Sequence, residues 1–149
     1  MDPLSLAASI AGLISLTLTV TKTTTDYVSS FRHAPEESVQ LAEELSALNG
    51  ALDSLNRFLT SKSDDLKTFS STSTLVATAS SCRSSLEALQ ATLQGFIEAS
   101  RGRRWYKRLA WPLKKDDHVK AVSTIQRFTQ IFHFSLSIDG WCVSSKLLI

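Results

Sequence analysis

The chain has 149 residues, of which 43% are hydrophobic and 20% charged, and its formal net charge is +2. These values are ordinary for a single globular domain, and a net charge this small does not by itself indicate a partner. The two cysteines, Cys82 and Cys142, form no disulfide framework and no metal-ligand spacing, which fits a reducing compartment. We therefore expect a cytoplasmic protein.

The charge is unevenly spread along the chain. Residues 101–120 hold eight Lys or Arg residues against two Asp residues, whereas the remainder holds eight bases against twelve acids. A basic block on a mildly acidic domain predicts an anionic surface as a partner.

The N-terminus is unusually apolar. The start, Met-Asp-Pro, is acidic and Lys22 follows the apolar run, which argues against a secretory signal peptide. Pro3–Thr21 is uncharged and would span about 28 Å as a helix, just enough to cross a bilayer. Because six of its residues are Ser or Thr, it is a marginal membrane segment.

A long helix is predicted over residues 3–31, with Pro3 at its first turn. Apolar and small residues recur at spacings of four and three, which places them on one face. These residues are Leu6, Ile10, Leu13, Thr17, Val20, Thr24, Tyr27 and Phe31. Further apolar residues lie off this face, and the pattern favours a central bundle helix packed on all sides over a membrane helix.

A second helix is predicted from Pro35 to about Thr60, with the clearest periodicity in the chain. Its apolar positions are Leu41, Leu45, Leu48, Leu52, Leu55 and Leu59. Packing within the chain is the default for this face, although it also allows self-association or pairing with other helical domains.

After a polar loop at 61–74, a third helix is predicted over about 75–99. Its apolar positions are Leu75, Ala79, Cys82, Leu86, Leu89, Leu93 and Phe96. A basic and aromatic connector follows at 100–115.

A fourth helix is predicted from Asp116 or Asp117 to a stop at Gly140. Its apolar positions are Val119, Val122, Ile125, Phe128, Phe132 and Leu136. The fold class is thus an all-α, antiparallel four-helix bundle with a long N-terminal helix, over residues 1–140, and the tail 141–149 has no assigned role.

Catalytic patterns are missing from the sequence. There is no phosphate-binding loop, no zinc-protease spacing and no marked nucleophile. We interpret Asp116, Asp117 and His118 as a helix N-terminus rather than an acid/base group. We expect a protein that is not an enzyme and has no cofactor or metal.

Two sets of residues are candidates for interaction. The candidate membrane-helix residues are Leu4, Leu6, Ile10, Leu13, Ile14, Leu16 and Leu18. The candidate anionic-surface residues are Arg101, Arg103, Arg104, Trp105, Lys107, Arg108, Lys114 and Lys115. Together with Tyr106 and Trp111, the second set suits anionic lipid, with nucleic acid the less favoured partner. A solvated loop whose Trp side chains tuck into the bundle remains an alternative.

The opening residues Met-Asp-Pro-Leu-Ser-Leu-Ala-Ala-Ser-Ile-Ala-Gly-Leu resemble a fungal N-terminal domain found ahead of NACHT and ankyrin modules in STAND (NLR-like) receptors. This HeLo-like family is catalogued with the N-terminal domain of an azaphilone pigment cluster protein. Similar segments follow at Ala34–Glu37, Leu45–Leu55, Arg104–Pro112 and Ile125–Leu136, so the likeness covers about residues 1–139.

The resemblance implies a helical bundle related to cell-death execution domains, in some of which activation frees the N-terminal helix to disturb membranes. We therefore expect a signalling or cell-death effector domain of heterokaryon-incompatibility type, recruited to membrane by release of residues 3–21. A passive adaptor and a nucleic-acid-associated protein are the alternatives. Since no NTPase or repeat domain follows, we expect either a stand-alone remnant or a chain cut short after Ile149.

Overall fold

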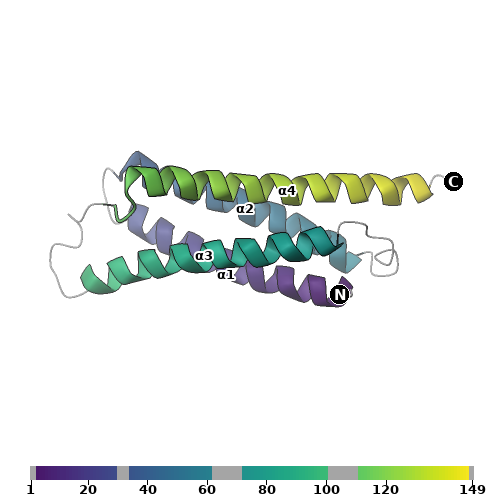
Figure 1. Cartoon of the computed structure of the whole chain (residues 1–149), viewed down its shortest axis with the longest axis horizontal. Coiled ribbons are helices and arrows are strands. Elements are labelled where there is room, and N and C mark those ends of the chain that lie inside the picture. Colours follow the sequence, from purple (N-terminus) through teal and green to yellow (C-terminus); the bar gives the residue numbers. More distant parts are fainter. Residues whose placement is uncertain (1–2, 30–33, 62–71, 101–110, 148–149) are drawn as a thin grey trace.

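The structure, a computed structural model, describes residues 3–29, 34–61, 72–100 and 111–147. These ranges contain four helices and no strand: α1 (Pro3–Ser29), α2 (Glu36–Ser61), α3 (Thr72–Ser100) and α4 (Lys115–Leu147). The chain runs up and down, so that consecutive helices are antiparallel (Figure 1). The prediction of an all-α four-helix bundle is confirmed.

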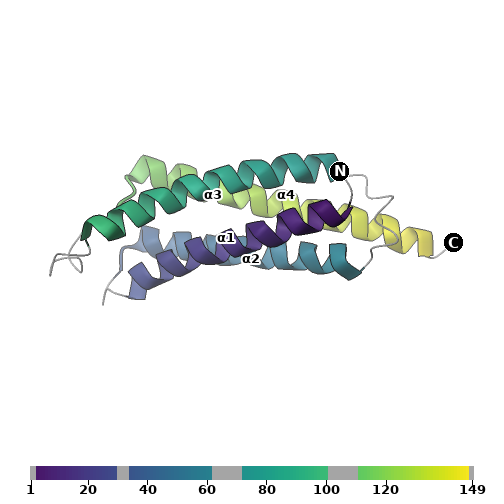
Figure 2. The ribbon, with the colours of Figure 1, turned by 90° about the horizontal axis from the view of Figure 1, so that it is seen from below.

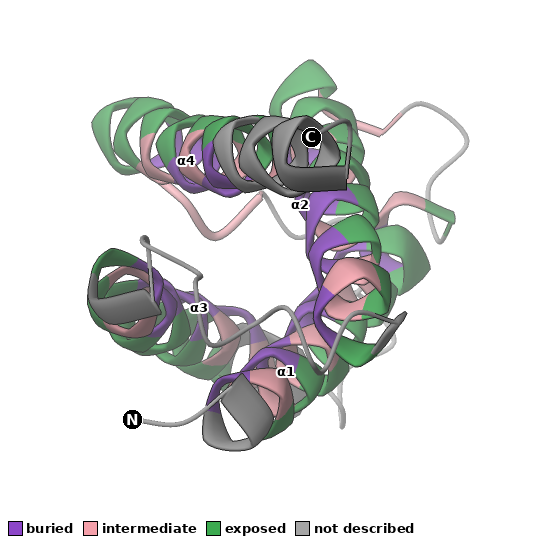
Figure 3. Cartoon of the chain, turned by 90° about the vertical axis from the view of Figure 1, so that its right-hand side faces the viewer, coloured by how far each residue is buried: buried purple, intermediate pink, exposed green. Residues whose placement is uncertain are grey.

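The order of the helices in space differs from their order in the chain. α1 packs against α2 and α3, and α4 packs mainly against α2, whereas α3 and α4 share the least extensive of the four interfaces. The spatial order is therefore α3, α1, α2, α4, with α1 parallel to α3 and α2 parallel to α4 (Figure 2). Viewed end-on, the four helices form an arc that is open between α3 and α4 (Figure 3).

The core follows spacings of three and four residues in every helix. Its residues are Leu6, Ile10, Leu13, Thr17, Val20, Thr24 and Tyr27 in α1; Ser38, Leu41, Leu45, Leu48, Leu52, Leu55 and Leu59 in α2, with Ala51 buried beside them; Leu75, Ala79, Cys82, Leu86, Leu89 and Leu93 in α3; and His118, Val122, Ile125, Phe128, Phe132 and Ser135 in α4. A heptad-like period keeps one narrow stripe of each helix on its neighbours, as in coiled coils. The predicted faces of the first three helices are confirmed, except for Phe31 and the Phe96 side chain, which lie outside the described residues.

Local signals set the start of α2. The Pro35 carbonyl accepts hydrogen bonds from the Ser38 amide at 3.0 Å and from the Ser38 hydroxyl at 2.7 Å. Proline suits this position because a helix start leaves the first amide hydrogens without a partner inside the helix. Glu36 and Glu37 occupy the first turn, where the helix dipole favours negative charge.

Two predictions about α4 are wrong. The helix does not stop at Gly140 but continues to Leu147, because a glycine costs a helix only about 1 kcal/mol and no proline follows it. The predicted core residue Val119 is 55% exposed, and His118 is buried in its place. The buried stripe reaches Val122 four residues after His118, so Val119 faces solvent.

Candidate interaction surface

α1 lies between α2 and α3, and its remaining side faces solvent. Only 28% of its most apolar 18-residue window is buried, because α2 and α3 cover one side alone. The prediction of a helix packed on all sides is therefore wrong. By length and composition, α1 is the one helix among the described residues that is apolar enough to cross a membrane.

The outward face of α1 carries no charge through its first half. Its exposed residues are Ala8, Ala11, Ser15, Leu18 and Thr19, and the next exposed residue along this side, Lys22, is the first charge. Leu18 is 50% exposed and is the largest apolar side chain on this side of the helix. We call the residues Ala8, Ala11, Ser15, Leu18 and Thr19 the outer face of α1.

The threonines of α1 satisfy their hydroxyl groups inside the helix. The hydroxyls of Thr17, Thr21 and Thr24 donate to the carbonyl oxygens four residues earlier at 2.8, 2.6 and 2.9 Å. Thr19 and Thr23 do the same at 3.0 Å each. A hydroxyl that donates within its own helix does not need water or a partner helix, so these residues suit both a protein core and an apolar solvent.

The candidate membrane-helix residues divide by burial. Leu6, Ile10 and Leu13 are almost fully buried against α2 and α3, whereas Ile14 and Leu16 are half-buried and Leu18 is exposed. The side chain of Leu4 lies outside the described residues. Of the seven candidate membrane-helix residues, three therefore belong to the core and three are partly accessible to solvent.

The candidate anionic surface is described only at its end. Lys114 and Lys115 are exposed at the start of α4. The remaining predicted residues, Arg101, Arg103, Arg104, Trp105, Lys107 and Arg108, lie outside the described residues. The geometry of the basic connector therefore stays a prediction.

Trp111 does not belong to that surface. Its ring packs against Tyr27 of α1, with the ring centroids 4.8 Å apart and the planes at 58°, and it lies against the hydrophobic core. This confirms, for Trp111, the alternative in which a connector tryptophan tucks into the bundle. The same burial raises the pKa of the Tyr27 phenol.

The Asp-Asp-His sequence forms no described site. Asp116 and Asp117 are exposed in the first turn of α4, whereas His118 is buried and its Nε2 lies 3.0 Å from Oε1 of Gln40 in α2. Within the described ranges, no cluster of His, Cys, Asp or Glu is placed to hold a metal ion.

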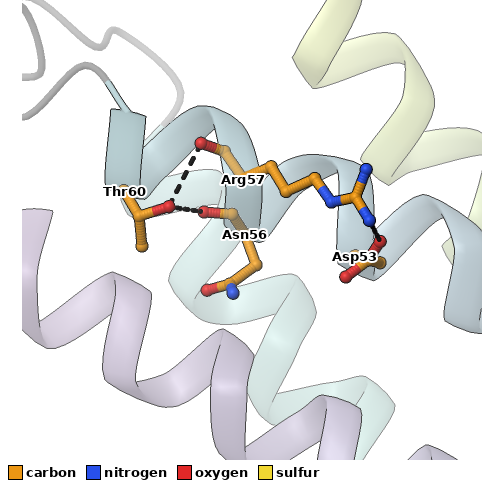
Figure 4. Close-up of polar contacts among 4 residues, drawn as sticks. All are labelled: Asp53, Asn56, Arg57 and Thr60. Atoms are coloured by element: carbon orange, nitrogen blue, oxygen red, sulfur yellow. Dashed lines mark hydrogen bonds and ion pairs between the residues drawn. The ribbon is translucent and has the colours of Figure 1, made fainter.

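The exposed side of α2 carries charged residues. On α2, Arg57 pairs with Asp53 at 3.1 Å, and the Thr60 hydroxyl donates to the carbonyls of Asn56 and Arg57 at 2.9 and 3.2 Å (Figure 4). Both side chains of the ion pair are at least half exposed, so the pair contributes at most about 0.5 kcal/mol. This is an ordinary solvated surface, in contrast to the outer face of α1.

One feature of the molecule was not predicted from the sequence. A cleft of about 310 Å³ lies between α3 and α4, at the end of the bundle where Pro112 and Leu113 lead into α4. The signal for it is the run of small residues on the facing sides of the two helices, Ser85, Ala88 and Thr92 on α3 and Ala121 and Thr124 on α4. Small side chains leave the space between the helices unfilled.

These observations define the chain as a small all-α bundle domain with a loosely closed fourth interface and an N-terminal helix whose exposed side carries no charge before Lys22. Residues 1–130 match the family model described as pigment biosynthesis cluster protein PigL N-terminal. The chain belongs to this family, which confirms the resemblance to the azaphilone-pigment type. No curated protein and no solved structure matches the chain.

Proposed function

We propose that this domain is a non-enzymatic signalling or effector domain of the fungal NLR-like type, whose α1 leaves the bundle and inserts into membrane. The observation that carries the proposal is the outer face of α1, which has no charge, together with five threonine hydroxyls bonded within the helix. A helix built in this way is as compatible with a bilayer as with the bundle.

The balance between the two locations is close. Within residues 3–21 the bundle buries four apolar side chains nearly completely, Leu6, Ile10, Leu13 and Val20, each worth about 1.5–3 kcal/mol. A bilayer would bury these equally and would also cover Ile14, Leu16 and Leu18, which the bundle leaves partly accessible. A modest trigger can therefore shift the equilibrium, and the bases of residues 101–115 would hold the domain at anionic lipid.

The contacts that retain α1 are mostly apolar. The side chain of Gln90 in α3 donates to the Thr23 hydroxyl at 3.4 Å, a long hydrogen bond. Arg83 of α3 lies beside Gly12 but is paired with Glu87 at 3.2 Å within its own helix. Neither contact places a charged anchor on α1.

Dye release from phosphatidylglycerol vesicles tests the proposal with the full chain. We expect release by the wild type and a loss of release in Ala11→Glu and Leu18→Glu, because a charge at the centre of a membrane helix costs about 2.5–3.5 kcal/mol. The matched control is Thr25→Glu, which adds the same charge on an exposed residue of α1 beyond the uncharged segment. All three changes lie on the surface and should alter stability by no more than about 0.5 kcal/mol.

Two results would contradict membrane insertion. One is a wild-type protein that releases no dye at any ratio of protein to lipid. The other is an equal effect of all three glutamate substitutions, which would indicate surface electrostatics rather than burial. A stable dimer that Leu18→Glu dissociates would instead support the passive adaptor, with the outer face of α1 as its contact.

A further inference from the structure

The cleft between α3 and α4 has the form of a small ligand site. It is lined mainly by apolar side chains, and the segment that enters α4 contributes to its walls. The residues that form these walls are Leu86 and Leu89 of α3, Ile125 and Phe128 of α4, and Pro112 and Leu113 before α4. Apolar walls between helices of a bundle are a common setting for ligands.

The size of the cleft selects a slender occupant. Its volume of about 310 Å³ lies at the small end of the range of about 300–1,000 Å³ found for ligand pockets. The rim residues Ala88, Thr92 and Ala121 are small and leave the mouth open along its length. A single aliphatic chain fits these dimensions.

The mouth of the cleft carries a cation. Lys120 lines it, is exposed, and makes no ion pair with any residue that the structure describes. Asp117 lies one turn earlier on α4 and also lines the cleft. Its carboxylate would repel an anionic group and so direct that group toward Lys120. Residues 114–120 hold three lysines against two aspartates. The charge at this end therefore favours an anionic head group.

We propose that the α3–α4 cleft binds an aliphatic chain that ends in a carboxylate, with the chain between Leu89 and Phe128 and the carboxylate on Lys120. The site is built from α3, α4 and the segment before α4, and no residue of α1 lines it. Binding in the cleft does not require release of α1, so either proposal can fail without the other.

Isothermal titration of the full chain with dodecanoate, below the concentration at which it forms micelles, tests this site. We expect saturable binding with one ligand per chain. Ala88→Phe fills the cleft from an exposed position and should abolish binding, whereas its control Ala91→Phe, an exposed alanine of the same helix outside the cleft, should not. Lys120→Glu should weaken binding at least about tenfold, and Lys120→Arg should restore it.

The head group and the source of the chain are tested separately. Dodecyltrimethylammonium, of equal chain length, should bind more weakly than dodecanoate to the wild type and more tightly to Lys120→Glu. Equal binding of both amphiphiles would overturn the role of the carboxylate. Binding to phosphatidylglycerol vesicles without saturable binding of dodecanoate, or binding of dodecanoate that Ala88→Phe leaves unchanged, would overturn the site itself.

Discussion

Tyr27 of α1 and Trp111, in the segment before α4, form a tilted ring contact with their centroids 4.8 Å apart. Tyr27 lies in the last turns of α1 and is buried, and Trp111 lies four residues before α4. Because α1 and α4 are separated by α2 in the arc, this contact ties them together at the end where α1 terminates. It anchors the half of α1 that follows Lys22, while the apolar half keeps one side exposed to solvent.

Trp111→Ala should lower the free energy of unfolding by about 2–4 kcal/mol, because it removes a large ring that packs on the core and on Tyr27. Urea unfolding followed by circular dichroism measures the loss. Trp111→Phe keeps a ring and removes an indole N–H that has no partner among the described residues, so its loss should be smaller. Equal losses in the two variants would show that ring packing is not the source.

The hydrophobic periodicity predicted the fold and most of the core, since a buried stripe at spacings of three and four leaves a clear trace in the leucines of α2. It could not predict the order of the helices in space, because one stripe per helix does not specify its neighbours. The exposed side of α1 was missed for a related reason. Small residues such as Ala8 and Ala11 satisfy a packed helix and an exposed one equally well.

The candidate site was predicted less well than the fold. Leu6, Ile10 and Leu13 are buried in the bundle core, and a membrane helix would need the same apolar residues. The sequence alone therefore does not distinguish a core role from a membrane role. The cleft was missed because it arises where small residues of two helices that lie far apart in the sequence face each other. His118 was missed as a core residue because histidine is ordinarily assigned to the surface, although Gln40 provides a partner for its ring.

Thr17→Val should change the free energy of unfolding by less than about 1 kcal/mol. Thr17 is fully buried, but its hydroxyl donates to the Leu13 carbonyl of its own helix and joins no other element. Valine has nearly the same shape and leaves the carbonyl in its helical hydrogen bond. Leu13→Ala provides the contrast in the same denaturation assay, with an expected loss of about 2–5 kcal/mol. A large loss in Thr17→Val would show that the hydroxyl serves a contact between helices.

The revised register of α4 predicts opposite results for two adjacent residues. Val119→Glu should be neutral within about 0.5 kcal/mol because Val119 is 55% exposed. His118→Ala should cost about 1–3 kcal/mol because it removes a buried ring and leaves Gln40 without its 3.0 Å contact. Thermal unfolding of both variants measures the difference. Loss of stability in Val119→Glu but not in His118→Ala would show that Val119 is the buried residue, as the sequence predicted.

Cys82 should make stability fall in alkaline solution. Burial raises the pKa of the Cys82 thiol to about 12, from an ordinary value of 9.0. The unfolded chain therefore loses this proton first, and between about pH 9 and pH 12 it binds fewer protons than the folded chain, so the free energy of unfolding decreases with rising pH. In a Cys142→Ser background, urea unfolding from pH 8 to pH 10 should show a smaller decrease for Cys82→Ala than for its parent. Identical slopes would show that the thiol does not contribute.

Gly50 offers a stabilising change that tests whether α2 has an open outer side. A Cβ atom added at Gly50 meets nothing within 4 Å, and the residue lies in the middle of the helix with ordinary backbone angles. Alanine has a smaller conformational entropy cost in a helix than glycine, so Gly50→Ala should raise the free energy of unfolding by about 0.5–1 kcal/mol. The reverse change at a neighbouring exposed position, Ala47→Gly, should lower it by a similar amount. If Gly50→Ala destabilises the domain, a second chain or another part of this one must approach α2 at that point, because the described helices leave the space empty.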